Sequence, residues 1–275
     1  MQGVPEFFEH TADVAQFRRP PARTGIELYR AHIVRHAFEP HTHAAFGFGA
    51  IEHGVERFRY AGSDHLAPAQ SLVLMNPDVL HTGSAETPGG WRYRMIYIEP
   101  AVLAEVSAQQ DWSFAQAVVS SDRPRALRVS QLLAALWQAQ EPLAFDSLLF
   151  QLVGELQPLA RAPGAARDEK CIRMAPVIDY MHAHLDRRLA LEDLAQVAGL
   201  SPFHFLRQFK AQYHVTPQQM LMALRLYRAK DLLAKGHAPA QVAAAAGLCD
   251  QAHLTKAFSQ RYGVTPARYQ RQMQN

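Results

Sequence analysis

The chain has 275 residues, of which 48% are hydrophobic and 19% are charged, a composition typical of folded globular proteins. No apolar run approaches the roughly 18 residues that a membrane-spanning helix needs, and the first twenty residues lack the basic start and apolar block of a secretory signal. Two cysteines, Cys171 and Cys249, are too few for a disulfide framework. We therefore expect a cytoplasmic protein that has no membrane partner.

The net charge of +3 is divided unevenly along the chain. Residues 171–275 hold 13 Lys and Arg against 6 Asp and Glu, whereas residues 1–170 hold 15 against 19. A basic C-terminal third on an acidic remainder predicts two domains, the second of which meets a polyanion.

Residues 26–98 show the pattern of short β-strands. The segments ELYRAHIV, AFGFGAIE, VERFRYAG, QSLVLMNP and WRYRMIYIE are rich in aromatic and β-branched residues, and turn sequences such as AGSD and ETPGG separate them. In VERFRY, Glu56, Phe58 and Tyr60 alternate with Val55 and two arginines, as in a half-buried strand. Many short strands with close turns predict a sandwich or a small barrel.

From about residue 124 the hydrophobic period becomes helical. The apolar positions are Leu132, Leu133, Leu136 and Trp137, then Phe145, Leu148, Leu149, Leu152, Leu156 and Leu159. Two helices fit this pattern, and they either cover one side of the sheet or present a stripe to a second copy of the chain. Both interpretations stay open at this point. Residues 161–170, RAPGAARDEK, have the composition of a linker.

Residues 171–275 contain a diverged internal repeat. LAQVAGL at 194–200 recurs as VAAAAGL at 242–248, and RQFKAQYHVTP at 207–217 aligns with KAFSQRYGVTP at 256–266. Each copy predicts a helix, a tight turn at a glycine and a second helix. That is the helix-turn-helix arrangement, in which the second helix enters the DNA major groove.

Residues that favour a helix N-terminus precede the second helix of each unit. Ser201 and Pro202 precede one of them, and Asp250 precedes the other. The segment that joins the units, residues 216–236, has no helix breaker inside it. A helix of roughly 20 residues spans about 30 Å, close to the roughly 34 Å between successive major-groove faces of B-DNA. One chain is therefore expected to read two successive groove segments.

At the level of motifs, this third of the chain resembles the AraC/XylS family of bacterial transcription regulators. The resemblance rests on AGLSPFHFLRQFKAQYHVTP at 198–217 and on the F-x-x-R-Y-G-V-T-P-x-x-Y pattern from Phe258 to Tyr269. It implies an α+β chain of two domains: a cupin-like β-barrel with two C-terminal helices, then an all-α domain with two helix-turn-helix units joined by a long helix. The boundaries we expect are 1–160 for an effector-binding and dimerisation domain, 161–170 for the linker and 171–275 for the DNA-binding domain.

The resemblance also implies which residues contact DNA. The base-contacting positions fall on Phe203, Leu206 and Arg207 in the first unit and on Gln251, Ala252, His253, Thr255 and Lys256 in the second. Arg207 suits guanine and Gln251 suits adenine. Lys210, Arg225, Arg228, Lys235, Arg261 and Arg268 suit phosphates, which set register rather than sequence. The predicted core residues are Phe205, Phe209, Leu224, Leu254, Phe258 and Tyr262.

Three histidines stand out in the N-terminal half. His41 and His43 are two apart in PHTHAAFGFGA, which places them on one face if the segment is a strand, and His81 closes a later strand in SLVLMNPDVLHTG. These segments resemble the two cupin motifs, although the glutamate that enzymatic cupins add is absent and Glu52 lies too far along. Three imidazoles suit a divalent metal such as Zn²⁺, Ni²⁺ or Cu²⁺. Alternatively, they hydrogen-bond to one another, to an effector or to backbone carbonyls.

These observations favour a ligand-responsive, sequence-specific DNA-binding transcription regulator over an enzyme. The expected partners are promoter DNA, an unknown small-molecule effector, a second copy of the chain and, if the protein is an activator, RNA polymerase. The alternative is a metal-dependent cupin enzyme fused to a DNA-binding module. No catalytic residue and no cofactor beyond the three-histidine metal emerges from the sequence.

Overall fold

The computed structural model describes residues 11–20, 23–160 and 169–274. Its first domain is a β-barrel of two antiparallel sheets. One sheet holds, in spatial order, β1 (Val14–Arg18), β2 (Ile26–Ile33), β9 (Trp91–Ile98), β4 (Phe46–His53), β7 (Leu72–Met75) and β10 (Val118–Val119). The other holds β3 (Phe38–His41), β8 (His81–Ala85), β5 (Val55–Tyr60) and β6 (Ser63–Pro68).

The inward positions of both sheets fill the barrel. Phe58 and Tyr60 point inward from β5, as their alternation predicts, and they meet Trp91 and Tyr93 of β9 in one buried cluster. Glu56 follows the same alternation and is buried with them. The barrel interior therefore carries a carboxyl group among aromatic rings.

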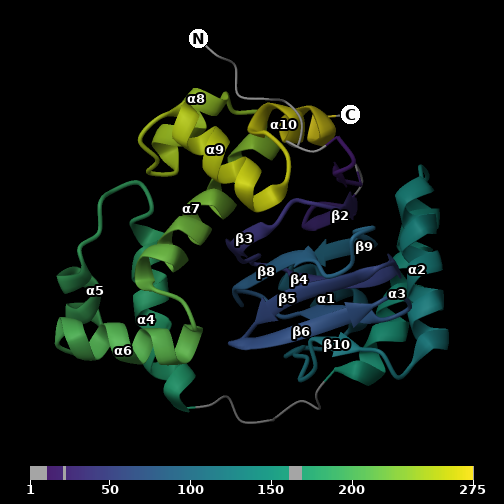
Figure 1. Cartoon of the computed structure of the whole chain (residues 1–275), viewed down its shortest axis with the longest axis horizontal. Coiled ribbons are helices and arrows are strands. Elements are labelled where there is room, and N and C mark those ends of the chain that lie inside the picture. The colour runs from purple at the N-terminus through teal and green to yellow at the C-terminus, as the bar shows by residue number, and fades with distance from the viewer. Residues whose placement is uncertain (1–10, 21–22, 161–168, 275) are drawn as a thin grey trace.

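Three helices follow the strands: α1 (Pro100–Ser107), α2 (Arg123–Gln138) and α3 (Pro142–Leu156), with a short 3-10 turn at Gln157–Leu159. The helices α2 and α3 cover the outer face of the larger sheet (Figure 1). Leu133, Leu136, Leu149 and Leu152 are buried there against the sheet. The apolar stripe of these helices is thus core, which decides between the two interpretations that the periodicity left open. The strands β1 and β10 and the helix α1 are additions that the sequence patterns do not predict.

The second domain is all helical, as expected. Its helices are α4 (Glu169–Ala183), α5 (Leu191–Val197), α6 (Pro202–Tyr213), α7 (Pro217–Ala234), α8 (Pro239–Ala245), α9 (Gln251–Tyr262) and α10 (Pro266–Gln274). The pairs α5–α6 and α8–α9 are the two helix-turn-helix units, and α7 joins them. Residues 161–168 of the predicted linker lie outside the described residues, and residues 169–170 already belong to α4.

Local signals explain where the helices of the two units begin and end. Asp250 Oδ1 accepts a hydrogen bond of 2.7 Å from the backbone N–H of His253 and so caps α9. Thr216 caps α7 in a reciprocal arrangement with Gln219. Ser201 stands at the start of α6 but makes no side-chain cap bond. Gly199 adopts a φ of +65°, the left-handed conformation that favours glycine in the turn between α5 and α6.

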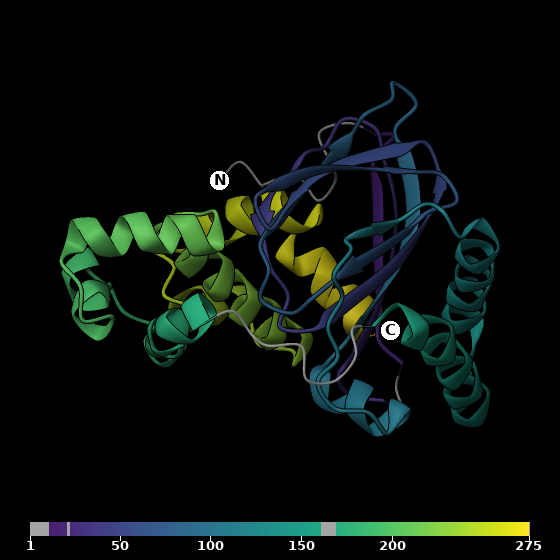
Figure 2. The same cartoon turned by 90° about the horizontal axis from the view of Figure 1, so that it is seen from below.

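The helical domain packs against the mouth of the barrel. Figure 1 shows α8, α9 and α10 along the top of the barrel, whereas α2 and α3 flank it on the right, and Figure 2 shows the helices α9 and α10 close to the barrel from below. The helix α9 of the second unit contacts β3, and α10 contacts β1. The buried residues of α8, α9 and α10 form one continuous cluster with those of the barrel. Leu80, which precedes β8, joins the core of the first unit instead. Both units therefore rest on the barrel.

Candidate functional site

The predicted base-contacting positions of α6 are on the surface. The side chain of Phe203 is 77% exposed, Leu206, Arg207 and Lys210 are also exposed, and Arg207 Nη2 lies 2.8 Å from His204 Nε2. The opposite side of the helix carries Phe205 and Phe209, which are fully buried. An exposed aromatic ring on the same helix face as an exposed guanidinium is unusual on a solvent-facing surface, and both groups suit contacts with the edge of a base pair.

The predicted positions of α9 are presented in the same way. Gln251, Ala252 and Lys256 are exposed, while His253 and Thr255 are half-buried. The Thr255 hydroxyl donates a hydrogen bond of 2.7 Å to the backbone carbonyl of Gln251, which leaves its methyl group as the exposed feature. Buried on the other side are Leu254, Phe258 and Tyr262, as predicted.

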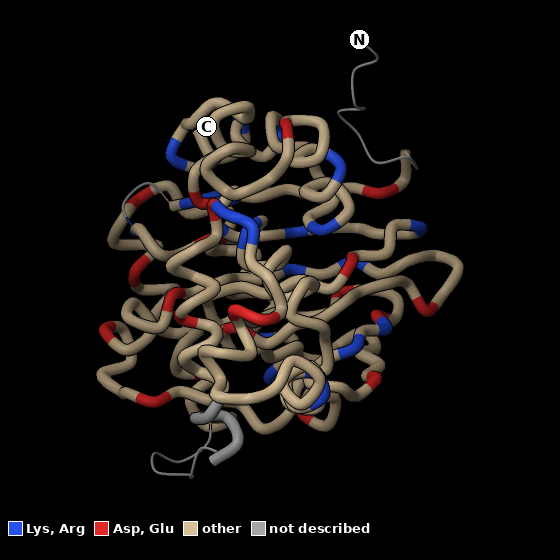
Figure 3. Tube along the Cα trace, turned by 90° about the vertical axis from the view of Figure 1, so that its left-hand side faces the viewer, with Lys and Arg blue, Asp and Glu red and all other residues tan. Residues whose placement is uncertain are grey.

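The cations assigned to phosphate contacts divide into two groups. Lys210, Arg228 and Lys235 are exposed and Arg268 is half-buried. Arg225 donates hydrogen bonds to the carbonyls of Leu185 and Arg187. Arg261 is only 5% exposed because it is inserted into the barrel mouth. In this structure it therefore faces the first domain and not solvent. Basic and acidic positions are interspersed over the face shown in Figure 3, so the positive charge forms no single stripe.

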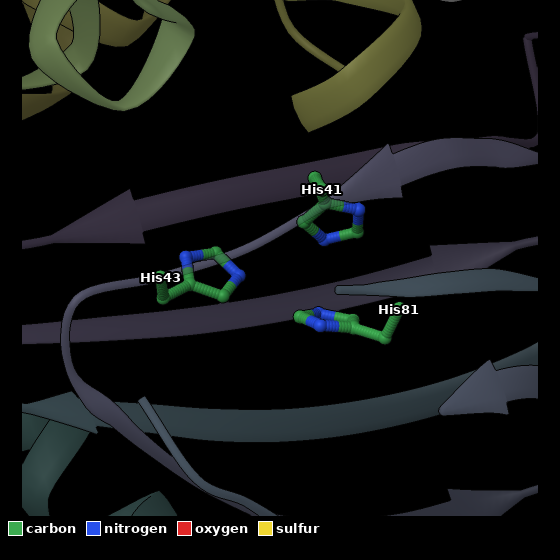
Figure 4. Close-up of side chains that lie close together, drawn as sticks. All are labelled: His41, His43 and His81. Atoms are coloured by element: carbon green, nitrogen blue, oxygen red, sulfur yellow. The ribbon is translucent and has the colours of Figure 1, made fainter. Parts of the chain in front are cut away.

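The three histidines gather at the barrel mouth, as the sequence predicts (Figure 4). His41 ends β3 and pairs across the ladder with His81, which begins β8 and does not end a strand as expected. His43 lies in the link between β3 and β4, so the two-residue spacing within one strand is not what brings it there. Ring centroids are 4.1 Å apart for His41 and His81 and 5.2 to 5.3 Å apart for the pairs with His43.

Two of the three rings bond to the backbone. His41 Nδ1 lies 2.8 Å from the Glu39 carbonyl and His81 Nδ1 lies 3.1 Å from the Val79 carbonyl. His43 Nε2 is buried without a hydrogen-bond partner. Burial, followed by nearby positive charge, lowers the pKa of His41 and His43 well below its usual value, and burial lowers the pKa of His81 to about 4. The imidazoles are therefore neutral at physiological pH.

Residues of the second domain close the space above the histidines. Arg261 and Tyr262, at the end of α9, line one narrow cavity of about 30 Å³ together with His41, His43 and His81. Arg261 Nη2 donates to the Pro40 carbonyl, but its Nε and Nη1 have no partner, and neither has the Tyr262 hydroxyl. Glu56 lines the same cavity from below. Burial raises the pKa of Glu56 to about 8.

An ion pair lies beside this cavity at the domain interface. Lys230 of α7 donates to Glu27 of β2, and Tyr269 of α10 donates a 2.6 Å hydrogen bond to the other carboxylate oxygen. The ammonium group of Lys230 is buried among four aromatic rings, among them Phe17 at 4.8 Å and Tyr262 at 5.0 Å. Burial lowers the pKa of Lys230, and Glu27 opposes that shift. Such a pair is expensive to separate, since each partner leaves the other as an unpaired buried charge.

A larger cavity of about 380 Å³ opens next to the ion pair. Both domains line it: Arg19, Glu27, His43 and Tyr97 come from the barrel side and Tyr227, Lys230 and Lys235 from α7 and its end. Sequence reasoning did not find Lys230 or Glu27 as functional candidates, and it assigned Arg261 to a phosphate contact and not to the domain interface. For Glu56, the alternation in VERFRY indicates an inward position and could have marked it as a candidate. The interface residues have no such pattern in their own segments.

The two domains match two family models. Residues 23–153 match the AraC-like ligand binding domain and residues 194–272 match a helix-turn-helix domain. Together with the fold, these matches show that the chain belongs to the AraC family of transcription regulators. No described helix is long and apolar enough to cross a membrane.

Among relatives, the probable transcriptional regulator LumQ of Photobacterium leiognathi is 34% identical over 148 residues, which are 52% of this chain and 60% of LumQ. YbfI of Bacillus subtilis, named an uncharacterized HTH-type transcriptional regulator, is 26% identical over 83% of this chain and 86% of its own. A more partial match, AdaA of the same organism, is named a bifunctional transcriptional activator and DNA repair enzyme.

Solved structures of ToxT from Vibrio cholerae share the whole architecture. The apo form aligns with a TM-score of 0.61 at 12% identity over 91% of this chain and 98% of that chain. The form bound to an unsaturated fatty acid aligns with a TM-score of 0.60 at 11% identity over 95% of both. At such identities the likeness is one of fold.

Proposed function

We propose that the protein is a ligand-responsive, sequence-specific regulator of transcription that binds promoter DNA in the bacterial cytoplasm. The observation that carries the proposal is the position of α9. Its outer face exposes Gln251, Ala252 and Lys256, while its final residues, Arg261 and Tyr262, enter the barrel. Any change at the barrel mouth therefore acts directly on a helix that reads DNA.

Base reading is assigned to Phe203, Leu206 and Arg207 on α6 and to the five exposed or half-exposed positions on α9. Arg207→Ala is expected to cost roughly 1–3 kcal/mol on the preferred sequence and to relax the preference at one base pair. Lys210→Ala is the matched control, because a phosphate contact weakens binding to all sequences alike. Fluorescence anisotropy on the preferred duplex and on single-base variants separates the two. Equal losses on all duplexes for Arg207→Ala would contradict base reading.

We assign the effector to the 380 Å³ cavity between the domains. Its volume is in the range of small-molecule sites. Four cations line it, Arg19, Arg23, Lys230 and Lys235, against the three carboxylates Glu27, Glu99 and Asp231. This lining favours a small molecule that bears an anionic group, which competes with Glu27 for Lys230. Such a ligand binds one arrangement of the two domains more tightly than the other. It therefore shifts the population toward the arrangement that it binds more tightly.

Regulation fits the barrel better than catalysis does. The cavity at the histidines has a volume of about 30 Å³, room for a water molecule or two rather than an organic substrate. Glu52, the nearest candidate for the missing cupin glutamate, pairs with Arg94 at 2.6 Å and is not among the residues that line the cavity. Turnover of a substrate that is lost in His43→Ala would instead support the metal-dependent enzyme.

A second copy of the chain is the partner that we assign to α3. Leu143 and Phe150 are 80% and 68% exposed. They lie seven residues apart, and Gly154 continues the stripe with open space beside it. A stripe on one helix is self-complementary across a two-fold axis. Phe150→Asp should convert a dimer to a monomer in light scattering, whereas Gln151→Asp, its exposed neighbour, should not. As an activator, the dimer would contact RNA polymerase.

A further inference from the structure

The hydrogen bonds of His41 and His81 determine which of their ring nitrogens carries a free lone pair. A backbone carbonyl only accepts, so the bonds to Glu39 and Val79 assign the ring protons of His41 and His81 to Nδ1. Their Nε2 atoms are then unprotonated. Carbonyl partners of this kind orient metal-binding imidazoles and fix their tautomer. His43 adds a third buried nitrogen, Nε2, that has no partner.

The spacing of these nitrogens suits one ion. One ring nitrogen of each histidine lies within 4.8 Å of those of the other two, and all three residues are buried. Zinc holds nitrogen ligands at about 2.0–2.1 Å in a tetrahedron, which brings them roughly 3.4 Å apart by that geometry. Rotation of the side chains by the ion closes the difference. Three nitrogen ligands leave one tetrahedral position open.

Residues of α9 line the cavity next to the three histidines. Arg261 and Tyr262 line the cavity above the histidines, and the Arg261 Nε and Nη1 atoms and the Tyr262 hydroxyl are buried there without partners. Lys230 stands nearby, within 5.0 Å of the Tyr262 ring centroid. A divalent ion alone would be repelled by these cations. A small anion in the open position of the ion weakens this repulsion and can accept hydrogen bonds from the guanidinium.

We propose that His41, His43 and His81 bind one zinc ion, and that Arg261 and Tyr262 of α9 hold the anion that completes its coordination. The zinc site itself does not depend on the proposed function; only the effect of zinc on DNA binding rests on it. Zinc and the docking of α9 on the barrel then stabilise each other, since a ligand shared by two domains favours the arrangement that assembles its site. Zinc occupancy thus holds the second reading helix on the barrel.

The test uses the full chain, stripped of metal with a chelator and titrated with zinc chloride against a competing indicator. We expect one zinc ion per chain. His43→Ala and His81→Ala should each lower the zinc affinity by about a hundredfold or more, which exceeds the loss expected when only a hydrogen-bond partner of a ligand is removed. His53→Ala, which removes an exposed histidine at the end of β4, should bind as the wild type does. The visible spectrum of the Co²⁺-loaded chain gives an independent readout of tetrahedral nitrogen coordination.

Coupling to α9 is read by hydrogen exchange. Zinc should slow exchange of the amides of residues 258–262, and Tyr262→Phe should reduce that protection while the protein still binds zinc. Binding that is equal in wild type, His43→Ala and His81→Ala would mean an adventitious ion only and would overturn the site. Zinc binding without any change of exchange in α9 would overturn the coupling. Fluorescence anisotropy of the metal-free protein on DNA tests the proposed function separately, because that measurement contains no zinc.

Discussion

Glu56 offers a quantitative test of the barrel interior. Its side chain is 5% exposed, and no hydrogen bond or ion pair to it is found among the described residues. Its carboxylate lies beside Gly83, where an added Cβ would lie 3.1 Å from Glu56 Oε1. Burial without a partner disfavours the charged carboxylate and raises the pKa from 4.5 to about 8.

The sign of the resulting pH dependence follows from proton linkage. Because the folded state holds the proton more tightly than the unfolded state, the free energy of unfolding falls as the pH rises from 4.5 to 8. At about 1.4 kcal/mol for each pH unit, the loss is about 3 kcal/mol at pH 7 and approaches 5 kcal/mol above pH 8 by the same conversion. Glu56→Gln keeps the shape and removes the titration.

Urea unfolding of wild type and Glu56→Gln at several pH values measures this difference. The three tryptophans, Trp91, Trp112 and Trp137, all lie in the first domain, so their fluorescence reports that domain alone. The contributions of all other titrating groups cancel when the unfolding free energies of the two proteins are subtracted. The variant should match the wild type near pH 5 and be more stable by about 3 kcal/mol at pH 7. A difference that stays constant across this range would refute the reasoning.

Four further substitutions, one of them a control, test the interface and the helix ends. Lys230→Met should cost roughly 3 kcal/mol, because Glu27 stays buried and keeps only Arg19 as a cation partner, with Arg19 Nε 3.8 Å away; thermal unfolding of the full chain measures it. Asp250→Ala should cost about 1 kcal/mol through loss of the α9 cap; Ser201→Ala, which removes no cap bond, should cost only a small part of that in the same denaturation assay. Gly62→Ala should loosen the docking of the first unit, since an added Cβ would lie 2.5 Å from His214 Nδ1; faster proteolysis of the 161–170 region would show it, and unchanged proteolysis would argue against it.

The helical domain was predictable because its signals are local. Caps such as Asp250 and Thr216, and a turn glycine such as Gly199, act within a few residues of the helices they limit. The repeat then assembles those helices into two units without any knowledge of distant contacts. The exposed faces that we propose for base reading follow from the burial of the opposite sides, for example Phe205 buried and Phe203 exposed.

The interface was not predictable for the opposite reason. Lys230 and Glu27 are 203 residues apart, and neither segment shows that it will meet the other. In the sequence, Arg261 looks like the other basic residues of a DNA-binding helix, and only packing against β3 reveals that it is buried. Glu56 shows the middle case. Its inward position was readable from the strand alternation, but its lack of a partner depends on the whole barrel.

The central claim is that this chain reads DNA sequence. Fluorescence anisotropy of the full chain, at physiological salt, on the DNA upstream of its own gene and on a scrambled duplex tests it most directly, because non-specific binding depends on salt and specificity is a ratio. The account predicts a preference of about a thousandfold or more for the upstream DNA, reduced by Arg207→Ala. Equal affinity for both duplexes, unchanged by Arg207→Ala, would contradict it.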